Sequence, residues 1–260
     1  MNNYVLECKD LNLSFKGHHA VKDFNLKVEK EKVYGLIGPN GAGKTTVLNL
    51  LTKVYKPNSG FMLLNGKDTK KMSSIQINKQ GIARTFQNIR LFKEMTVLEN
   101  IMVGFHNDLK YSLLDSVFRT PKYFSEEKRI KDKSIDLLSI FNMEDKADTL
   151  SKNLSYGAQR RVEILRALST SPSVLLLDEP AAGMNSSETL NLFNVINKIK
   201  DKFKISFIII EHNMNFIMKI CNYIYVLNQG KTIAQGKPEE IQNNKEVESA
   251  YLGGQYVEGK

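Results

Sequence analysis

Apolar residues in positions 1–30 alternate with polar ones, a spacing typical of strands that have one buried face. Turn-forming residues interrupt this pattern at Lys16-Gly17 and again at positions 29–31. A further apolar run at 61–64 is followed by Asn65-Gly66, a dipeptide that favours a tight hairpin. We therefore expect the N-terminal part of the chain to form an antiparallel β subdomain.

Other apolar runs are continuous, and they occupy residues 33–37, 174–177, 206–210 and 223–227. Continuous runs of this length are typical of strands that are buried on both faces, as in parallel sheets. Between the second and third runs, apolar residues from Leu192 to Phe203 recur on one face of an expected amphipathic helix. Strands that alternate with helices predict an α/β fold with a mostly parallel sheet.

Residues 91–150 differ in character from the rest of the chain. They lack runs of β-branched residues, and apolar positions such as Ile135, Leu138 and Phe141 follow helical spacing. We interpret this segment as a helical insertion. The expected organisation is a core of residues 1–90 and 151–235, a helical subdomain of residues 91–150, and a C-terminal tail of residues 236–260.

The composition excludes some classes of protein. With 260 residues, 42% of them hydrophobic and 25% charged, the chain is long enough to bury a substantial core. No apolar run approaches the roughly 18 residues needed to cross a bilayer, and a charge comes too early in the N-terminal sequence for a signal peptide. We therefore expect a protein of the cytoplasm, with Cys8 and Cys221 as reduced structural thiols.

The formal net charge of +9 permits binding to nucleic acid, to an anionic membrane surface or to acidic ligands. The lysines are scattered, however, and the mild basic cluster at residues 122–133 also contains Glu126, Glu127 and Asp132. Mixed charges of this kind are typical of a solvated helix face. The charge alone therefore selects no partner.

A phosphate-binding motif begins where the apolar run 33–37 ends. Residues 38–45 read Gly-Pro-Asn-Gly-Ala-Gly-Lys-Thr and fit the pattern G-x-x-x-x-G-K-[ST]. Glycines let backbone N–H groups surround phosphate oxygens, and the helix that follows points its N-terminal dipole at the same charge. Lys44 can reach the β- and γ-phosphates, and the Thr45 hydroxyl can bind Mg²⁺. The expected phosphate-binding residues are Gly38, Pro39, Asn40, Gly41, Ala42, Gly43, Lys44, Thr45 and Thr46.

Two carboxylates follow the apolar run 174–177, namely Asp178 and Glu179. At the end of a buried strand, Asp178 would lie beside the phosphates and hold Mg²⁺. Glu179 is the candidate to orient or deprotonate an attacking water. The alternative is that these two carboxylates are an ordinary acidic strand end before Pro180, with a purely structural role. The upstream phosphate motif disfavours this alternative.

Gln87 and His212 also follow expected strands of the same sheet. The Gln87 amide is suited to Mg²⁺ or water, and a histidine at position 212 can donate a hydrogen bond to a γ-phosphate. By itself each residue is more often structural than functional. Their positions favour function, because α/β sheets bind ligands at the carboxyl ends of their strands.

The segment Leu154-Ser-Tyr-Gly-Ala-Gln159 precedes a strong helical pattern. From these residues alone, Ser155 either caps the helix or helps Gly157 to bind an anion at the helix start. The order of the motifs, from the phosphate loop through Gln87 and Ser155 to the carboxylates and His212, resembles that of the ATP-binding cassette ATPases. The resemblance covers nearly the whole chain, and the combined motifs are highly specific.

This resemblance implies a P-loop NTPase fold that works as a head-to-tail dimer with two enclosed ATP molecules. Ser155 and Gly157 then face the γ-phosphate held by the second subunit, and Phe15 matches the aromatic residue that stacks on adenine. The implied cofactors are ATP and Mg²⁺. Catalytic roles fall to Lys44, Gln87, Glu179 and His212, and the metal ligands are Thr45, Gln87 and Asp178.

The chain is more specifically similar to the larger ATPase of branched-chain amino acid importers. The stretches that carry this similarity are Leu154-Ser-Tyr-Gly, Glu179-Pro-Ala-Ala-Gly-Met-Asn185, an insertion with Phe118-Arg-Thr-Pro121, and the tail from Asn228-Gln-Gly230 through Ala250-Tyr-Leu-Gly253. Most cassettes have aspartate at the position of Asn185, but this subgroup resembles the chain in having asparagine. Ala158 is a modest departure from the usual glycine or glutamine.

Two other functions fit the ATPase motifs. A cassette that acts on nucleic acid is disfavoured, because such chains carry long coiled-coil insertions or two cassettes, and this chain has neither. A cassette for another substrate, including a lipid exporter, is compatible with Arg160-Arg161-Val162-Glu163-Ile164. The long insertion and the tail favour the amino acid importer.

The importer resemblance also implies partners and a location. We expect two transmembrane permease subunits, a second and smaller ATPase subunit, an extracytoplasmic substrate-binding protein that acts indirectly, and no nucleic acid. In isolation an ATP-dependent homodimer is expected to be possible. The implied location is peripheral, on the cytoplasmic face of the plasma (inner) membrane.

Overall fold

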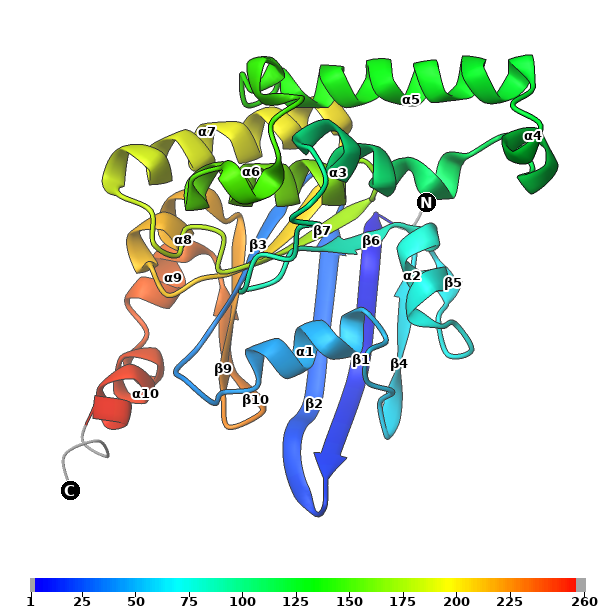
Figure 1. The fold of residues 1–260 in the computed structure, drawn as a ribbon. Coiled ribbons are helices and arrows are strands. Elements are labelled where there is room, and N and C mark those ends of the chain that lie inside the picture. Colours follow the sequence, from blue (N-terminus) through cyan, green and yellow to red (C-terminus); the bar gives the residue numbers. More distant parts are fainter. Residues whose placement is uncertain (1–2, 256–260) are drawn as a thin grey trace. The chain divides into compact units, whose positions relative to one another are not determined.

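A computed structural model describes residues 3–255 of the chain. Its contacts divide into two compact units, and Figure 1 shows the elements of both. The first unit comprises the chain up to Arg84 and again from Ser173 onward, and the second comprises Thr85–Pro172. The expected tail of residues 236–260 is described as far as residue 255, and residues 256–260 lie outside the described part.

The first unit contains an antiparallel sheet of four strands in the order β2-β1-β4-β5. These strands are β1 (Tyr4–Phe15), β2 (His18–Glu29), β4 (Ser59–Leu64) and β5 (Lys67–Asp68). Lys16 and Gly17 both have positive φ, as a two-residue hairpin turn requires. The expected antiparallel β subdomain is therefore confirmed.

A second sheet of the same unit has six strands in the order β10-β9-β3-β8-β7-β6, of which only the edge strand β10 is antiparallel to its neighbour. The strands are β3 (Val33–Ile37), β6 (Ile82–Arg84), β7 (Val174–Asp178), β8 (Ser206–Ile210), β9 (Tyr223–Asn228) and β10 (Lys231–Gly236). Every residue of β3, β7 and β8 is buried, as their continuous apolar sequences predicted. The mostly parallel sheet is therefore confirmed.

Helices of the first unit are α1 (Lys44–Leu51), α2 (Ser74–Gln80), α7 (Ser186–Phe203), α8 (Met214–Ile220), α9 (Pro238–Gln242) and α10 (Lys245–Gln255). The amphipathic helix expected from Leu192 onward is α7, which buries Leu192, Ile196 and Ile199. The apolar residues of α1 belong to one buried cluster with strands of both sheets, for example Leu6 and Leu176. This packing fixes the start of α1, where the phosphate motif lies.

The second unit is helical. It contains α3 (Val97–Gly104), η1 (Phe105–Asp108), α4 (Leu113–Val117), α5 (Pro121–Leu138), η2 (Glu144–Lys146), η3 (Ser151–Asn153) and α6 (Tyr156–Leu168). The helical insertion is thereby confirmed. The compact unit is longer than the expected 91–150 segment, because α6 packs on α3 and α5. None of the helices in residues 3–255 is both long enough and apolar enough to span a bilayer.

Candidate nucleotide-binding site

The phosphate motif forms a tight loop between β3 and α1. Gly38, Gly41 and Gly43 have φ angles of 149°, 77° and 104°, a range that favours glycine. A Cβ atom at Gly38 would lie 2.1 Å from the carbonyl oxygen of Leu227, and one at Gly43 would lie 2.8 Å from that of Ala20. Helix α1 has no side-chain cap, so the N–H groups of its first turn are left to an external acceptor. This backbone fits a bound phosphate chain.

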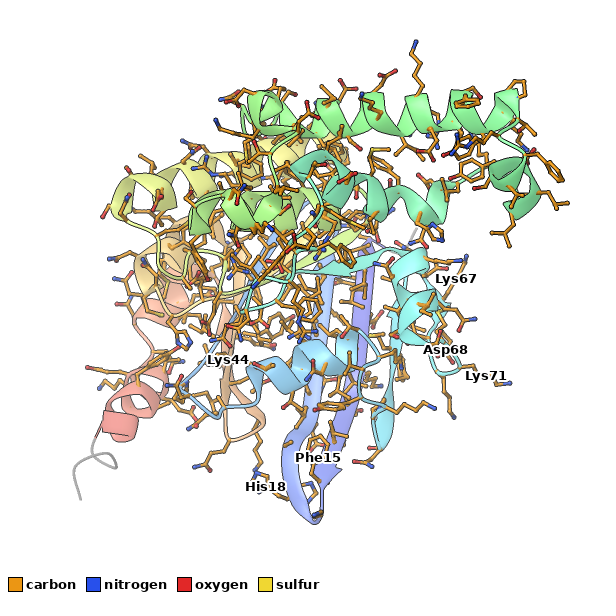
Figure 2. The ribbon with its side chains drawn as sticks, viewed as in Figure 1. Phe15, His18, Lys44, Lys67, Asp68 and Lys71 are labelled. Carbon is orange, nitrogen blue, oxygen red and sulfur yellow. The ribbon has the colours of Figure 1, made fainter. Side chains whose placement is uncertain are left out.

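Lys44 lies at the start of α1, where Figure 2 labels it, and its side chain turns back over the loop. The ammonium nitrogen donates to the carbonyl oxygens of Gly38 and Pro39, at 2.7 and 2.9 Å. Burial lowers the pKa of Lys44, and the nearby charges of Glu179 and Asp178 act against that change. A buried ammonium held inside the loop is suited to meet a phosphate oxygen.

Asp178 ends β7 and forms a buried ion pair that the sequence did not suggest. The guanidinium of Arg84, the last residue of β6, lies 2.8 Å from Asp178 Oδ2 and 2.6 Å from Asn49 Oδ1 on α1. This geometry depends on the parallel pairing of β6 with β7, which places their carboxyl ends together. Thr45, the other expected metal ligand in this unit, is exposed at the start of α1. Asp178 and Thr45 each carry an oxygen donor of the kind that Mg²⁺ takes, and Mg²⁺ usually keeps several waters and needs few protein ligands.

Glu179 directly follows β7 and has a positive φ of 50°, a conformation that is uncommon outside glycine. His212 Nε2 lies 2.9 Å from Glu179 Oε1, so the structure brings these two expected catalytic residues together. Buried Glu211 accepts hydrogen bonds from the backbone N–H groups of Ala181 (2.6 Å) and His212 (3.0 Å). Glu211, which the sequence reasoning missed, thereby fixes the loops that carry both residues.

Phe15 lies at the end of the β1–β2 hairpin, opposite His18, as Figure 2 shows. Its ring is partly exposed and meets the ring of Tyr55 edge to face, with centroids 5.2 Å apart. A partly exposed aromatic ring is suited to stacking on another ring. The adenine contact of Phe15 stays a prediction.

Gln87, Ser155 and Gly157 lie in the second unit. Gln87 and Ser155 are exposed, and Gly157 is half-buried. The Ser155 hydroxyl caps α6 by accepting the N–H of Ala158. Ser155 therefore acts as the helix cap that was one of its two expected roles. The roles of all three residues toward phosphate or metal stay predictions.

The backbone beside Gln87 is held by a buried ion pair on α6. Arg160 Nη1 lies 2.8 Å from Glu163 Oε2, and both side chains are almost completely buried. The same guanidinium donates to the carbonyl oxygens of Phe86 and Gln87, the latter at 2.6 Å. The conformation of the chain at Gln87 is therefore tied to α6.

The other end of this segment is held by the same face of α6. Glu163 Oε1 accepts the backbone N–H groups of Phe86 (3.4 Å) and Arg90 (3.2 Å), and Arg166 donates to the carbonyl oxygen of Arg90. Arg160, Glu163 and Arg166 are three residues apart, so they form one stripe of the helix. That spacing was visible in the sequence, but its partners were not.

Comparisons with known proteins agree with this geometry. The family model described as ABC transporter matches residues 21–182, and the model described as branched-chain amino acid ATP-binding cassette transporter matches residues 231–257. The high-affinity branched-chain amino acid transport ATP-binding protein BraF of Pseudomonas aeruginosa is 42% identical over 97% of this chain and 99% of its own length. The protein LivG of Escherichia coli K12, which has the same descriptive name, gives the same values.

Among solved structures, an ATP-binding cassette of an ABC transporter in its ADP conformation matches with a TM-score of 0.83 and 31% identity. The match covers 96% of this chain and 99% of that one. The sequence motifs are specific for the ATP-binding cassette fold, and the chain has this fold. The fold carries the glycine loop, the buried lysine and the Glu179–His212 pair. The chain belongs to the ABC transporter family and carries that family's ATP-hydrolysing domain.

Proposed function

We propose that this chain is the ATP-hydrolysing subunit of a branched-chain amino acid importer. The observation that carries the substrate assignment is the similarity of residues 231–257 to a family model specific to such transporters. It is supported by the near-complete overlap with BraF and LivG. The tail is informative because the ATPase motifs are shared by cassettes for many substrates, whereas the tail is not part of those motifs.

The loop and Lys44 bind the β- and γ-phosphates, and Phe15 binds the adenine. Thr45, Asp178 and Gln87 are the residues that would hold Mg²⁺, which would supply neutralising charge on the phosphate oxygens. Glu179 orients the attacking water and accepts its proton. His212, which contacts the Glu179 carboxylate, positions that carboxylate and hydrogen-bonds the γ-phosphate.

Hydrolysis in this proposal requires a second ATPase subunit. Ser155 and Gly157, at the start of α6, contact the γ-phosphate bound by that partner, where the N-terminal end of the helix dipole favours an anion. In the cell the partner is a related, smaller ATPase, and the isolated chain forms a homodimer only with ATP. The assembly lies on the cytoplasmic face of the membrane through its contacts with two permease subunits.

The permeases contact the second unit next to Gln87. Phe92 and Met95 are exposed there, whereas Ile89 and Leu91 are half-buried. Such apolar side chains on the surface are typical of a contact site. A ligand drives a conformational change only through contacts that differ between two states, and Gln87 offers such a contact when ATP and metal are bound.

The test is reconstitution of the chain with the permeases, second ATPase and binding protein encoded beside it. Proteoliposomes should take up labelled leucine, isoleucine or valine when ATP is enclosed. Cysteines at positions 92 and 95 should crosslink to the permeases. Uptake of a different substrate class would overturn the substrate assignment. Normal transport by Phe92→Asp, together with no crosslinks at either position, would overturn the docking site.

A further inference from the structure

The second unit carries an unusual concentration of exposed apolar side chains on α4. Leu113, Leu114, Val117 and Phe118 are 87%, 68%, 74% and 75% exposed, and we call these four residues the α4 tip. Figure 1 shows α4 just before the start of α5, the helix that it contacts. Since these side chains cover no core, their apolar character has no role inside the unit.

Polar contacts, not burial, give the α4 tip its shape. Ser112 and Asp115 form a capping box, in which each accepts the other's backbone N–H. The Thr120 hydroxyl donates to Asp115 Oδ1 at 3.1 Å, and Thr120 in turn caps α5. The tip is therefore ordered in advance with its apolar side chains pointing to solvent.

The exposed charges closest to the α4 tip are mostly basic, namely Lys110, Arg119 and Lys122, against Asp115 inside it. Of the acidic residues just beyond, Glu126 pairs with Arg129, Glu127 accepts the Tyr111 hydroxyl, and Asp108 is exposed. Both carboxylate oxygens of Asp115 already accept hydrogen bonds within the turn. An apolar centre with a basic border is therefore complementary to anionic headgroups above an acyl layer.

We propose that the α4 tip inserts into the headgroup boundary of an anionic lipid bilayer. Side chains this exposed project from the surface, and a lipid layer can cover a projection without a matching shape. One helical turn offers too few side chains to anchor a protein alone, so the basic residues must contribute as well. The inference goes beyond the proposed function, on which it rests only in placing the chain at a membrane.

The absence of tryptophan from the sequence allows a direct test with the full-length chain. Phe118→Trp places a single reporter in the tip, and Leu190→Trp places a matched one on α7, where Leu190 is 63% exposed. Vesicles of phosphatidylcholine with phosphatidylglycerol should shift the emission of Phe118→Trp to the blue and leave Leu190→Trp unchanged. The chain should bind vesicles of pure phosphatidylcholine at least about tenfold more weakly than the anionic vesicles. Added salt should weaken its binding to the anionic vesicles.

Vesicle flotation tests the same surface without a reporter. Leu114→Ser with Phe118→Ser, and separately Arg119→Glu with Lys122→Glu, should abolish co-flotation, while Leu190→Ser should not. Unchanged ATPase rates in these variants would show that they are folded. Equal binding to neutral vesicles, or co-flotation of either double variant, would overturn the proposal.

A photocrosslinker at position 118 in the assembled transporter separates lipid from protein. Labelled lipid is the expected product, and a product with a permease alone would overturn the proposal in favour of a protein contact. The vesicle experiments need no permease and no substrate. Failure of the amino acid importer assignment would therefore leave their outcome unaffected, and the two conclusions can fail separately.

Discussion

Arg84 and Asp178 form an ion pair 2.8 Å long, with side chains only 6% and 5% exposed, at the carboxyl ends of neighbouring strands. The Arg84 guanidinium compensates the charge of the Asp178 carboxylate, which is expected to bind the metal. Because Arg84 also contacts Asn49 on α1, one guanidinium joins the helix after the phosphate loop to the strand that carries Asp178. Arg84 is also the last residue before the second unit.

We predict that Arg84→Met destabilises the nucleotide-free protein by roughly 3–5 kcal/mol, because it removes one partner of a buried ion pair. Urea unfolding monitored by circular dichroism measures this change. Binding of MgATP should recover part of the loss, so the ligand-induced rise in melting temperature should be larger than in the wild type. Arg84→Lys keeps the charge but not the forked contacts, and it should fall between the two. Wild-type stability of Arg84→Met without ligand would contradict the prediction.

Lys44→Ala should abolish tight ATP binding, since it removes the ammonium that faces the β- and γ-phosphates. ATP at about 100 times its dissociation constant adds roughly 2.7 kcal/mol to the stability of a protein that binds it. Thermal unfolding of the wild type should therefore shift upward by several degrees with MgATP, and that of Lys44→Ala should not. If millimolar nucleotide gave the wild type no shift, the assignment of the loop would be wrong.

Local sequence patterns predicted the parts of this fold that are determined locally. The strands around Leu36, Leu176 and Ile208 are buried on both sides, so their sequences are apolar throughout. The phosphate loop was predictable because its glycines are required by the backbone itself. The position of Glu179 and His212 near one another followed from their places at strand ends.

Contacts that depend on strand order or helix packing were not predictable. Arg84 and Asp178 meet because β6 lies beside β7, and a periodic pattern does not specify which strands are neighbours. Glu163 accepts hydrogen bonds from backbone N–H groups that lie more than 70 positions earlier in the sequence. The short helix α4 was missed as a separate element, because one turn gives too few residues for a period and its order comes from the caps at Ser112 and Thr120.

Glu179→Gln should reduce the rate of ATP hydrolysis by about 10² to 10⁴, the usual range for loss of a general base. The amide keeps the shape of the side chain and can keep the contact with His212, so ATP affinity should hold or improve. Steady-state phosphate release and equilibrium nucleotide binding separate these two effects. Hydrolysis near the wild-type rate would remove Glu179 from the catalytic role.

Glu179→Gln with ATP should also give the largest dimer fraction of any state of the isolated chain, as measured by light scattering. The reason is that unhydrolysed ATP links the loop of one subunit to the α6 start of the other. Gly157→Asp places a negative charge at that start and should prevent dimer formation while leaving nucleotide binding intact. A stable dimer without nucleotide, formed through another surface, would contradict this account.

Arg160 and Glu163 provide the last test, of whether α6 and the Gln87 segment move together. Apolar residues of similar volume often replace a buried ion pair without loss of stability. Arg160 and Glu163, however, also hold the carbonyl groups of Phe86 and Gln87 and the N–H groups of Phe86 and Arg90. Arg160→Met with Glu163→Leu should therefore lower the free energy of unfolding by a few kcal/mol, in the range expected for lost hydrogen bonds. Amide hydrogen exchange at residues 86–90 should therefore accelerate, and permease stimulation of the ATPase should fall while nucleotide affinity is unchanged.

Arg161→Met, at the neighbouring position on α6, is the matched control. Unchanged exchange and full permease stimulation in the double variant would show that the pair only fills space, and that Gln87 moves independently of α6.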